Sequence, residues 1–230
     1  MKHMKRIIPF IALAVLALSC TRKPAQPAAG DWVREATVYE LNVRQLTPEG
    51  TFAAAEKHLP LLRELGVDVV WVMPPYPIGQ EGRKGSLGSY YAIRDYCDIN
   101  PEFGTLADFD HFLAEAHALG LKVILDWVAN HTAPDHPWVT EKPADWYVRD
   151  EAGHTIVEYD WTDIAKLNYE NHDMRAAMAD AMRFWIARGI DGFRCDVAYQ
   201  VPQDFWADVL PALRSEAGRP LYLLAEGEES

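Results

Sequence analysis

The sequence predicts a parallel α/β fold of the (β/α)8-barrel type, and two observations carry this prediction. A helix ending at a glycine, a short turn and a short apolar strand follow one another repeatedly; the glycines are Gly66, Gly120, Gly189 and Gly218. A glycine at this place adopts the positive φ of a helix C-cap, and strands that alternate with helices form a parallel sheet. The later strands end in Asp126, Asp196 and Glu226. Acids at the carboxyl ends of barrel strands are typical of a catalytic face.

The composition is that of one folded domain with a neutral ligand. The chain has 230 residues, of which 49% are hydrophobic and 24% charged, and its formal net charge is −12. An acidic surface disfavours nucleic acid and anionic membrane as partners, because both need a basic face. The 8 Trp and 10 Tyr can stack on sugar rings, although most aromatic residues serve packing.

The first thirty residues are predicted to lie outside the fold. Residues 1–20 have a basic start, an apolar stretch and small residues before Cys20, which resembles a bacterial lipoprotein signal peptide with Cys20 as the lipidated residue. An ordinary secretory signal is the alternative. Residues 21–30 are rich in Pro and Ala and predict a flexible tether. We therefore expect a protein of the bacterial cell envelope, in the periplasm or at the outer membrane, that contacts membrane only through its lipid anchor.

The first part of the domain contains two predicted strands with a helix between them. The strands are expected at 37–43 and 67–73, and the helix at 51–65, where Pro60 should kink or restart it. Residues 74–104 are rich in Gly, Pro and Tyr, which predicts a large loop above the barrel. Thr105 and Asp108 then form a capping box that opens the next helix.

The second part continues the alternation and contains a long insertion. Residues 132–170 show no clear periodicity, and a loop of this length in a compact domain is usually functional. The remaining predicted elements are strands at 121–127, 190–197 and 221–226 and helices at 172–188 and 203–217. We therefore expect a barrel truncated after about strand five, with a long insertion after strand three and two open edges.

Two acids on consecutive strands indicate a possible reaction. Neighbouring parallel strands are about 4.8 Å apart, so Asp196 and Glu226 should face one another. Retaining glycosidases use two carboxyl groups about 5–5.5 Å apart, one as nucleophile and one as acid/base. Arg194 lies two residues before Asp196, on the same side of the strand, and would keep it ionised. An Arg-x-Asp motif alone is usually a structural ion pair, but the nearby phrase DWVANH favours a functional one.

The phrases DWVANH, GFRCD and LLAEGE resemble the first three signature regions of glycoside hydrolase family 13, the alpha-amylase family. SYYAIRDYCDINPEFGT resembles the family's loop after strand two, and DIAKLNYEN its short motif before the third helix. The matches occur in the family's order over nearly the whole chain after the signal. This resemblance implies that residues 31–230 are the N-terminal part of a (β/α)8 glycoside hydrolase catalytic domain.

The resemblance also implies roles for individual residues. Asp196 would be the nucleophile, Glu226 the acid/base, and Arg194 the residue that orients Asp196. Three further residues are implied to shape the substrate site. Asp126 would anchor Arg194. His131 would donate or accept a hydrogen bond with a sugar hydroxyl, and Tyr91 would stack beneath that sugar. Asn130 matches a position that ligates calcium in many members of the family.

Three departures from the family pattern qualify these expectations. The fourth signature, a His-Asp pair after strand seven, is absent from the sequence. After Asp196 comes VAYQ, whereas calcium-dependent amylases often have Lys-His there, so we expect no required cofactor and treat calcium as optional. Gly227 and Glu228 replace a frequent aromatic residue, which leaves the subsites beyond the cleavage point unassigned.

The leading hypothesis is a retaining alpha-glucan hydrolase acting on starch or maltooligosaccharides. Residues 1–230 alone are expected to be inactive, because the Asp of the fourth signature, which would stabilise the distorted sugar, is missing. A transglycosylase or isomerase of the same family remains open, as does a non-catalytic amylase-like subunit that binds glucan or serves a structural role. A barrel enzyme with a metal at the acids fits less well, because His131 and His136 do not have a zinc-site spacing.

Overall fold

The computed structural model describes residues 31–228, and its centre is a sheet of five parallel strands. The strand order is β1-β2-β3-β6-β7, so consecutive strands along the barrel are neighbours. The predicted fold class, a (β/α) barrel truncated after about strand five, is confirmed. Residues 1–20 and 21–30, including Cys20, lie outside the described residues. No helix among the described residues is long and apolar enough to span a bilayer.

Four of the five strands are shorter than the sequence pattern predicts, and the third, expected at 121–127, has the expected length but begins one residue later. Their bounds are β1 (Val38–Leu41), β2 (Val69–Val72), β3 (Lys122–Val128), β6 (Gly192–Asp196) and β7 (Tyr222–Ala225). The first strand, expected at 37–43, ends at Leu41 because the chain turns into the short helix α2 (Val43–Leu46). The amides of Gln45 and Leu46 both bond the carbonyl of Asn42, which ends the extended backbone there.

The helices agree closely with the expected positions. The predicted helix at 51–65 is divided into α3 (Phe52–Ala55), the 3-10 turn η1 (Glu56–His58) and α4 (Leu59–Glu64), and Pro60 stands in the first turn of α4. The capping box of Thr105 and Asp108 opens α5 (Leu106–Ala118). The later helices are α7 (His172–Arg188) and α8 (Gln203–Ala217), and a short α1 (Asp31–Glu35) precedes the sheet.

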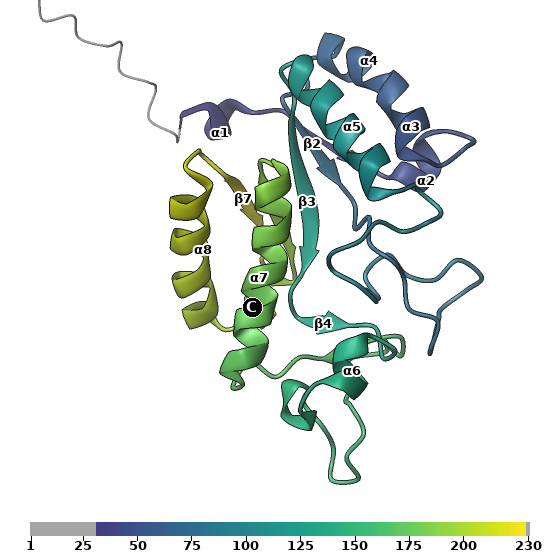
Figure 1. Cartoon of the computed structure of the whole chain (residues 1–230), viewed down its shortest axis with the longest axis vertical. Coiled ribbons are helices and arrows are strands. Elements are labelled where there is room, and N and C mark those ends of the chain that lie inside the picture. The colour runs from purple at the N-terminus through teal and green to yellow at the C-terminus, as the bar shows by residue number, and fades with distance from the viewer. Residues whose placement is uncertain (1–30, 229–230) are drawn as a thin grey trace, which may run out of the picture.

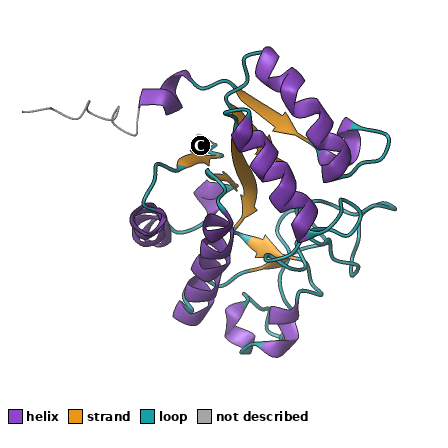
Figure 2. Ribbon diagram, turned by 45° about the horizontal axis from the view of Figure 1, so that its top comes forward, coloured by secondary structure: helices purple, strands orange, loops and turns teal. Residues whose placement is uncertain are grey.

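The helices pack in two groups around the strands. Figures 1 and 2 show α3, α4 and α5 beside the first strands, and α7 and α8 side by side near the later ones. At the carboxyl end of the sheet, the rings of Tyr76, Tyr96 and Trp127 are fully or almost fully buried. The Tyr96 and Trp127 ring centroids are 5.1 Å apart. Buried aromatic rings therefore pack against the carboxyl ends of the strands.

The segment 132–170 leaves the sheet at the end of β3 and returns to it. It contains α6 (Pro137–Glu141) and the 3-10 turn η2 (Ala144–Trp146), and β5 (Ala165–Lys166) pairs antiparallel with β4 (His131–Thr132). In Figure 1 this segment lies beyond the carboxyl end of β3. The β4–β5 pair therefore fixes the returning end of the segment against β4, which carries His131 and follows β3 directly.

Strand register places the charged side chains level with one another. Asp126 of β3 pairs with Arg194 of β6, and Cys195 pairs with Ala225 of β7. Glu226 therefore lies level with Asp196, and its amide donates to the Cys195 carbonyl at 3.0 Å. Gly192 permits this register, because a Cβ there would lie 1.8 Å from the carbonyl oxygen of Tyr222.

Candidate active site

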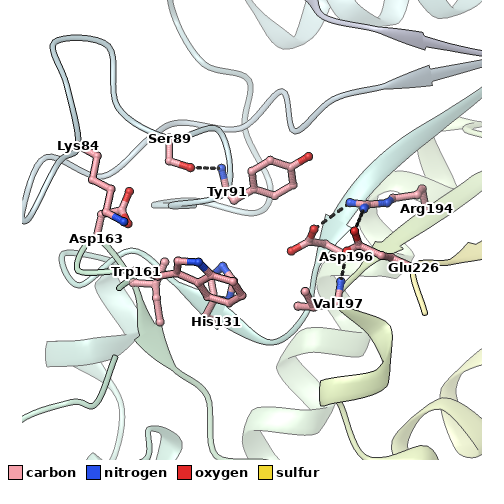
Figure 3. Close-up of a pocket in the computed structure, with 11 residues that line it drawn as sticks. Lys84, Ser89, Tyr91, His131, Trp161, Asp163, Arg194, Asp196, Val197 and Glu226 are labelled. Atoms are coloured by element: carbon pink, nitrogen blue, oxygen red, sulfur yellow. Dashed lines mark hydrogen bonds and ion pairs between the residues drawn. The ribbon is translucent and has the colours of Figure 1, made fainter. Parts of the chain in front are cut away.

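One guanidinium group holds three carboxylates at the ends of the strands. Arg194 Nη1 donates to Asp126 Oδ1 at 3.0 Å and to Asp196 Oδ1 at 2.8 Å, and Arg194 Nη2 lies 2.9 Å from Glu226 Oε1. Figure 3 shows the contacts of Arg194 with Asp196 and Glu226. The strands bring the predicted acid pair to the same group, because their carboxyl ends meet at one edge of the sheet.

The backbone after Asp196 contributes a further donor. Val197 has φ of 37° and ψ of 44°, a left-handed conformation that a β-branched residue rarely adopts. Its N–H donates to Glu226 Oε2 at 2.8 Å. Glu226 is thus held at both oxygens, by Arg194 and by a strained backbone amide. Strain of this kind persists where the surrounding structure fixes it, and it is concentrated at functional sites.

Two aromatic residues that the sequence reasoning missed support Asp126. The indole N–H of Trp71 donates to Asp126 Oδ2 at 3.1 Å, and the Arg194 guanidinium lies 4.9 Å from the centroid of a Trp71 ring. The Tyr76 hydroxyl donates to the Asp126 carbonyl at 3.0 Å. Asp126 is fully buried behind Arg194 and anchors it, as expected. The only signal in the sequence was that a buried tryptophan usually needs an acceptor for its N–H.

The cluster contains more acids than cations, which sets its protonation behaviour. Burial raises the pKa of Asp196 to about 6; Arg194 opposes this shift and Glu226 adds to it. Burial likewise raises the pKa of Asp126 to about 7 against the opposing effect of Arg194. Burial disfavours the charge of Arg194, yet the surrounding acids hold its pKa above the ordinary value. Asp196 is therefore ionised above about pH 6, as a nucleophile must be.

A pocket of about 380 Å³ opens in front of this cluster. Tyr91 and His131 both line it, as do Arg194, Asp196 and Glu226. In Figure 3, Tyr91 lies on one side of the pocket and His131 on the other. Burial lowers the pKa of His131 to about 4, so the ring is neutral near pH 7. A neutral imidazole suits a hydrogen bond to an uncharged hydroxyl.

Of the lining residues that were not predicted as site residues, three carry a charged side chain or an indole ring. They are Lys84 from the loop after β2, and Trp161 and Asp163 from the segment 132–170. The ring centroids of Trp161 and His131 are 5.7 Å apart, so both rings form the same wall. Trp161 gives the pocket an aromatic surface of the kind that packs against sugar rings. Asp163 opens the phrase DIAKLNYEN, but the resemblance implied no role for it, and Lys84 and Trp161 lie in none of the phrases that resemble the family.

Asn130, the expected calcium ligand, contacts its neighbours through its amide nitrogen, whereas an asparagine ligates calcium through its oxygen. Its side-chain nitrogen donates to Glu158 Oε2 at 2.5 Å and to Gln200 Oε1 at 3.1 Å. The ammonium group of Lys166 pairs with Glu158 Oε1. A lysine cation thus stands beside the acid that a metal ion would need. The residues around Asn130 do not fit calcium in this arrangement, and residues 31–228 contain no cluster of three or more His, Cys, Asp or Glu suited to a metal.

The parallel barrel strands and the acids gathered at their carboxyl ends define a (β/α)-barrel catalytic domain. The chain belongs to the alpha-amylase family, glycoside hydrolase family 13, since the family model for the alpha-amylase catalytic domain matches residues 29–212.

Similar proteins agree with this assignment. Probable oligo-1,6-glucosidase 3 of Bacillus subtilis is 32% identical over 203 residues, which is 72% of this chain and 35% of that protein. Alpha-amylase 3 of Dictyoglomus thermophilum is 29% identical over 245 residues, with 92% and 46% covered. A crystal structure of an alpha-amylase from Lactobacillus plantarum matches with a TM-score of 0.82 and 41% identity, covering 85% of this chain and 46% of that one. The chain therefore spans less than half the length of these relatives.

Proposed function

We propose that the protein is a retaining glycoside hydrolase that cleaves alpha-glucans. The observation that carries the proposal is the position of Asp196 and Glu226 on one guanidinium, facing a pocket lined by aromatic rings. A non-catalytic binding subunit would have no need for this acid pair.

In the proposed reaction, Asp196 attacks the anomeric carbon while Glu226 protonates the departing glycosidic oxygen. The result is a glycosyl ester on Asp196. Glu226 then removes a proton from water, which attacks the ester and releases the sugar with retained configuration. Arg194 keeps Asp196 ionised and oriented. One oxygen of Glu226 must leave its present donor, either Arg194 or the Val197 amide, before it can carry the proton, and substrate entering the pocket provides a reason for this change.

The proposed substrates are starch and maltooligosaccharides. Relatives include proteins named oligo-1,6-glucosidase, alpha-amylase and trehalose-6-phosphate hydrolase. One relative is named trehalose synthase, so isomerisation and transglycosylation remain the alternatives. Analysis of the products formed from maltotriose separates the three, because hydrolysis releases shorter sugars, transglycosylation also makes longer ones, and isomerisation changes only the linkage.

A covalent trap tests the mechanism directly. The protein would be incubated with 5-fluoro-α-glucosyl fluoride, whose activated leaving group allows the first step and whose ring fluorine slows the second. Peptide mass spectrometry should find the glycosyl adduct on the peptide that contains Asp196. The Asp196→Asn variant should form none. An adduct on another residue would contradict the assignment of the nucleophile.

Because the relatives are more than twice as long, the activity is proposed for the protein that contains these residues. The absence of starch cleavage by residues 1–230 alone stays a prediction. We propose that no metal is required, since Lys166 supplies the cation beside Asn130.

We also propose lipidation of Cys20 at the bacterial envelope, and intact mass spectrometry of native protein would test it.

A further inference from the structure

Asp163 is a buried acid with no partner. Its exposed fraction is only 3%, and it lines the pocket. No hydrogen bond or ion pair involves its carboxylate among the described residues, and Oδ2 is buried without any hydrogen-bond partner. Such a group costs free energy unless something bonds it, so its presence needs an explanation.

Asp163 lies at the end of the pocket away from the acid pair. Figure 3 shows Asp163 and Lys84 on one side and Asp196 and Glu226 on the other, with Tyr91 between them. The ammonium group of Lys84 donates to the Asp160 carbonyl at 2.5 Å rather than to Asp163. The pocket thus has a catalytic end and a second polar end.

The backbone around Asp163 is held in place. A Cβ added at Gly82 would lie 2.6 Å from the Thr162 carbonyl oxygen and 3.4 Å from Asp163 Cα, so the loop after β2 packs directly on this backbone. Trp161, two residues earlier, is packed against His131 and Tyr159. Asp163 therefore cannot readily turn its carboxylate out to bulk water.

We propose that Asp163 binds a hydroxyl group of the glucan, on the sugar unit at the end of the pocket away from the acid pair. A carboxylate accepts strong hydrogen bonds from hydroxyl donors, and a neutral sugar offers several of them. Lys84 can donate to an oxygen of the same unit. This inference rests on the proposed function and adds a specificity residue to it.

Calorimetric titration with maltotriose tests the inference. All variants carry Glu226→Gln to prevent turnover. Asp163→Ala should raise the Kd by about 10- to 100-fold, because a hydrogen bond to a charged group is lost. The matched control is Asp160→Ala, which removes an exposed acid from the same loop and should change the Kd by less than about twofold, as surface substitutions usually do.

A stability measurement separates binding from a structural role. Asp163→Asn keeps the shape and removes the unpartnered charge, so its Tm should equal or exceed that of the unaltered protein. A Tm several degrees lower would overturn the inference, and so would an unchanged Kd in Asp163→Ala. If the Glu226→Gln protein bound no maltotriose at all, the proposed function would fail together with this inference. Tight binding unaffected by Asp163→Ala would remove this inference alone.

Discussion

Two buried charge clusters lie at opposite ends of β3 and β6. At the amino-terminal end, one acid meets several donors, because Asp191 accepts from His117 Nε2 at 2.7 Å, Lys122 Nζ at 3.0 Å and the Val123 amide at 2.9 Å. At the carboxyl-terminal end the ratio is reversed, because Arg194 is the one cation among the described residues that pairs with the three acids. The Trp71 indole and the Val197 amide add only neutral donors there. The same two strands thus carry a cluster with surplus donors and one with surplus acids.

The pKa values of the acids follow this difference. Burial disfavours the charge of Asp191, yet its donors hold its pKa below the ordinary value. Burial raises the pKa of Asp196, and the neighbouring Glu226 adds to the shift. A cluster whose hydrogen bonds are all made stabilises the fold, whereas one with surplus acids retains groups that can react. Barrel enzymes generally divide stability and catalysis between the two ends of their strands in this way.

The largest expected effect is on turnover. Asp196→Asn should lower kcat/KM for the proposed maltooligosaccharide substrates by more than about a thousandfold, because it removes the proposed nucleophile. The Tm should not fall, since a buried acid with a raised pKa is removed. Kinetics and thermal unfolding of the same preparation check both parts. Asp191→Asn is the control and should keep its activity. Equal losses of activity in the two variants would contradict the division of roles between the two charge clusters.

The next effect is on stability at the catalytic cluster. Arg194→Met should lower the free energy of unfolding by about 3–5 kcal/mol, because it leaves buried carboxylates without their cation. The loss, measured by denaturant titration, should be smaller at pH 5 than at pH 8, where the acids are ionised. Arg183→Met is the control, since its ion pairs are partly exposed and should contribute less than about 1 kcal/mol. Equal losses in both variants would contradict the prediction.

A smaller loss is expected at the other cluster. Asp191→Asn should cost about 1.5–3 kcal/mol, the usual range for hydrogen bonds to a charged group. Because the folded-state pKa of Asp191 is lowered, its contribution is present above the ordinary pKa of Asp, near 4, and is lost as pH falls through the folded value. The free energies of unfolding of the variant and the unaltered protein, measured from pH 3 to 7, should therefore become equal at low pH. Divergence at low pH would show that another group carries the effect.

The pH profile of activity should report the catalytic cluster only. Asp196 must be ionised to attack, so kcat/KM should fall about tenfold per unit as pH drops below about 6. Asp191→Asn should leave this acidic limb in place, because Asp191 lies at the other end of the strands. A limb near pH 4 would mean that burial perturbs Asp196 less than the structure indicates.

Metal removal should have the smallest effect. Lys166 pairs with Glu158 beside Asn130, so EDTA or added Ca²⁺ should leave the Tm unchanged. Lys166→Met should lower the Tm, because Glu158 and Asn130 then lose the neighbouring cation. Scanning calorimetry with and without millimolar Ca²⁺ checks this. A rise of several degrees with Ca²⁺ would restore Asn130 as a metal ligand.

The sequence alone determined the order of elements and the family. Helices α7 and α8 occupy the predicted residues, because caps and apolar periodicity are local signals. The glycines at the helix ends have the positive φ that was expected. The acid pair was found in the same way, since the end of each parallel strand is visible in its own motif.

Only the tertiary structure decided which other groups join the site. Trp71 reaches Asp126 from the neighbouring strand, and Lys166 reaches Glu158 within the segment 132–170. A loop from another part of the chain packs on the backbone of Asp163. These contacts depend on strand register and on the path of long loops. Neither leaves a periodic signal, because the partners are distant in the sequence and their energies depend on burial. The sequence therefore determined which acids were available for chemistry, and the fold determined which acids are paired, which are raised in pKa and which are left without a partner.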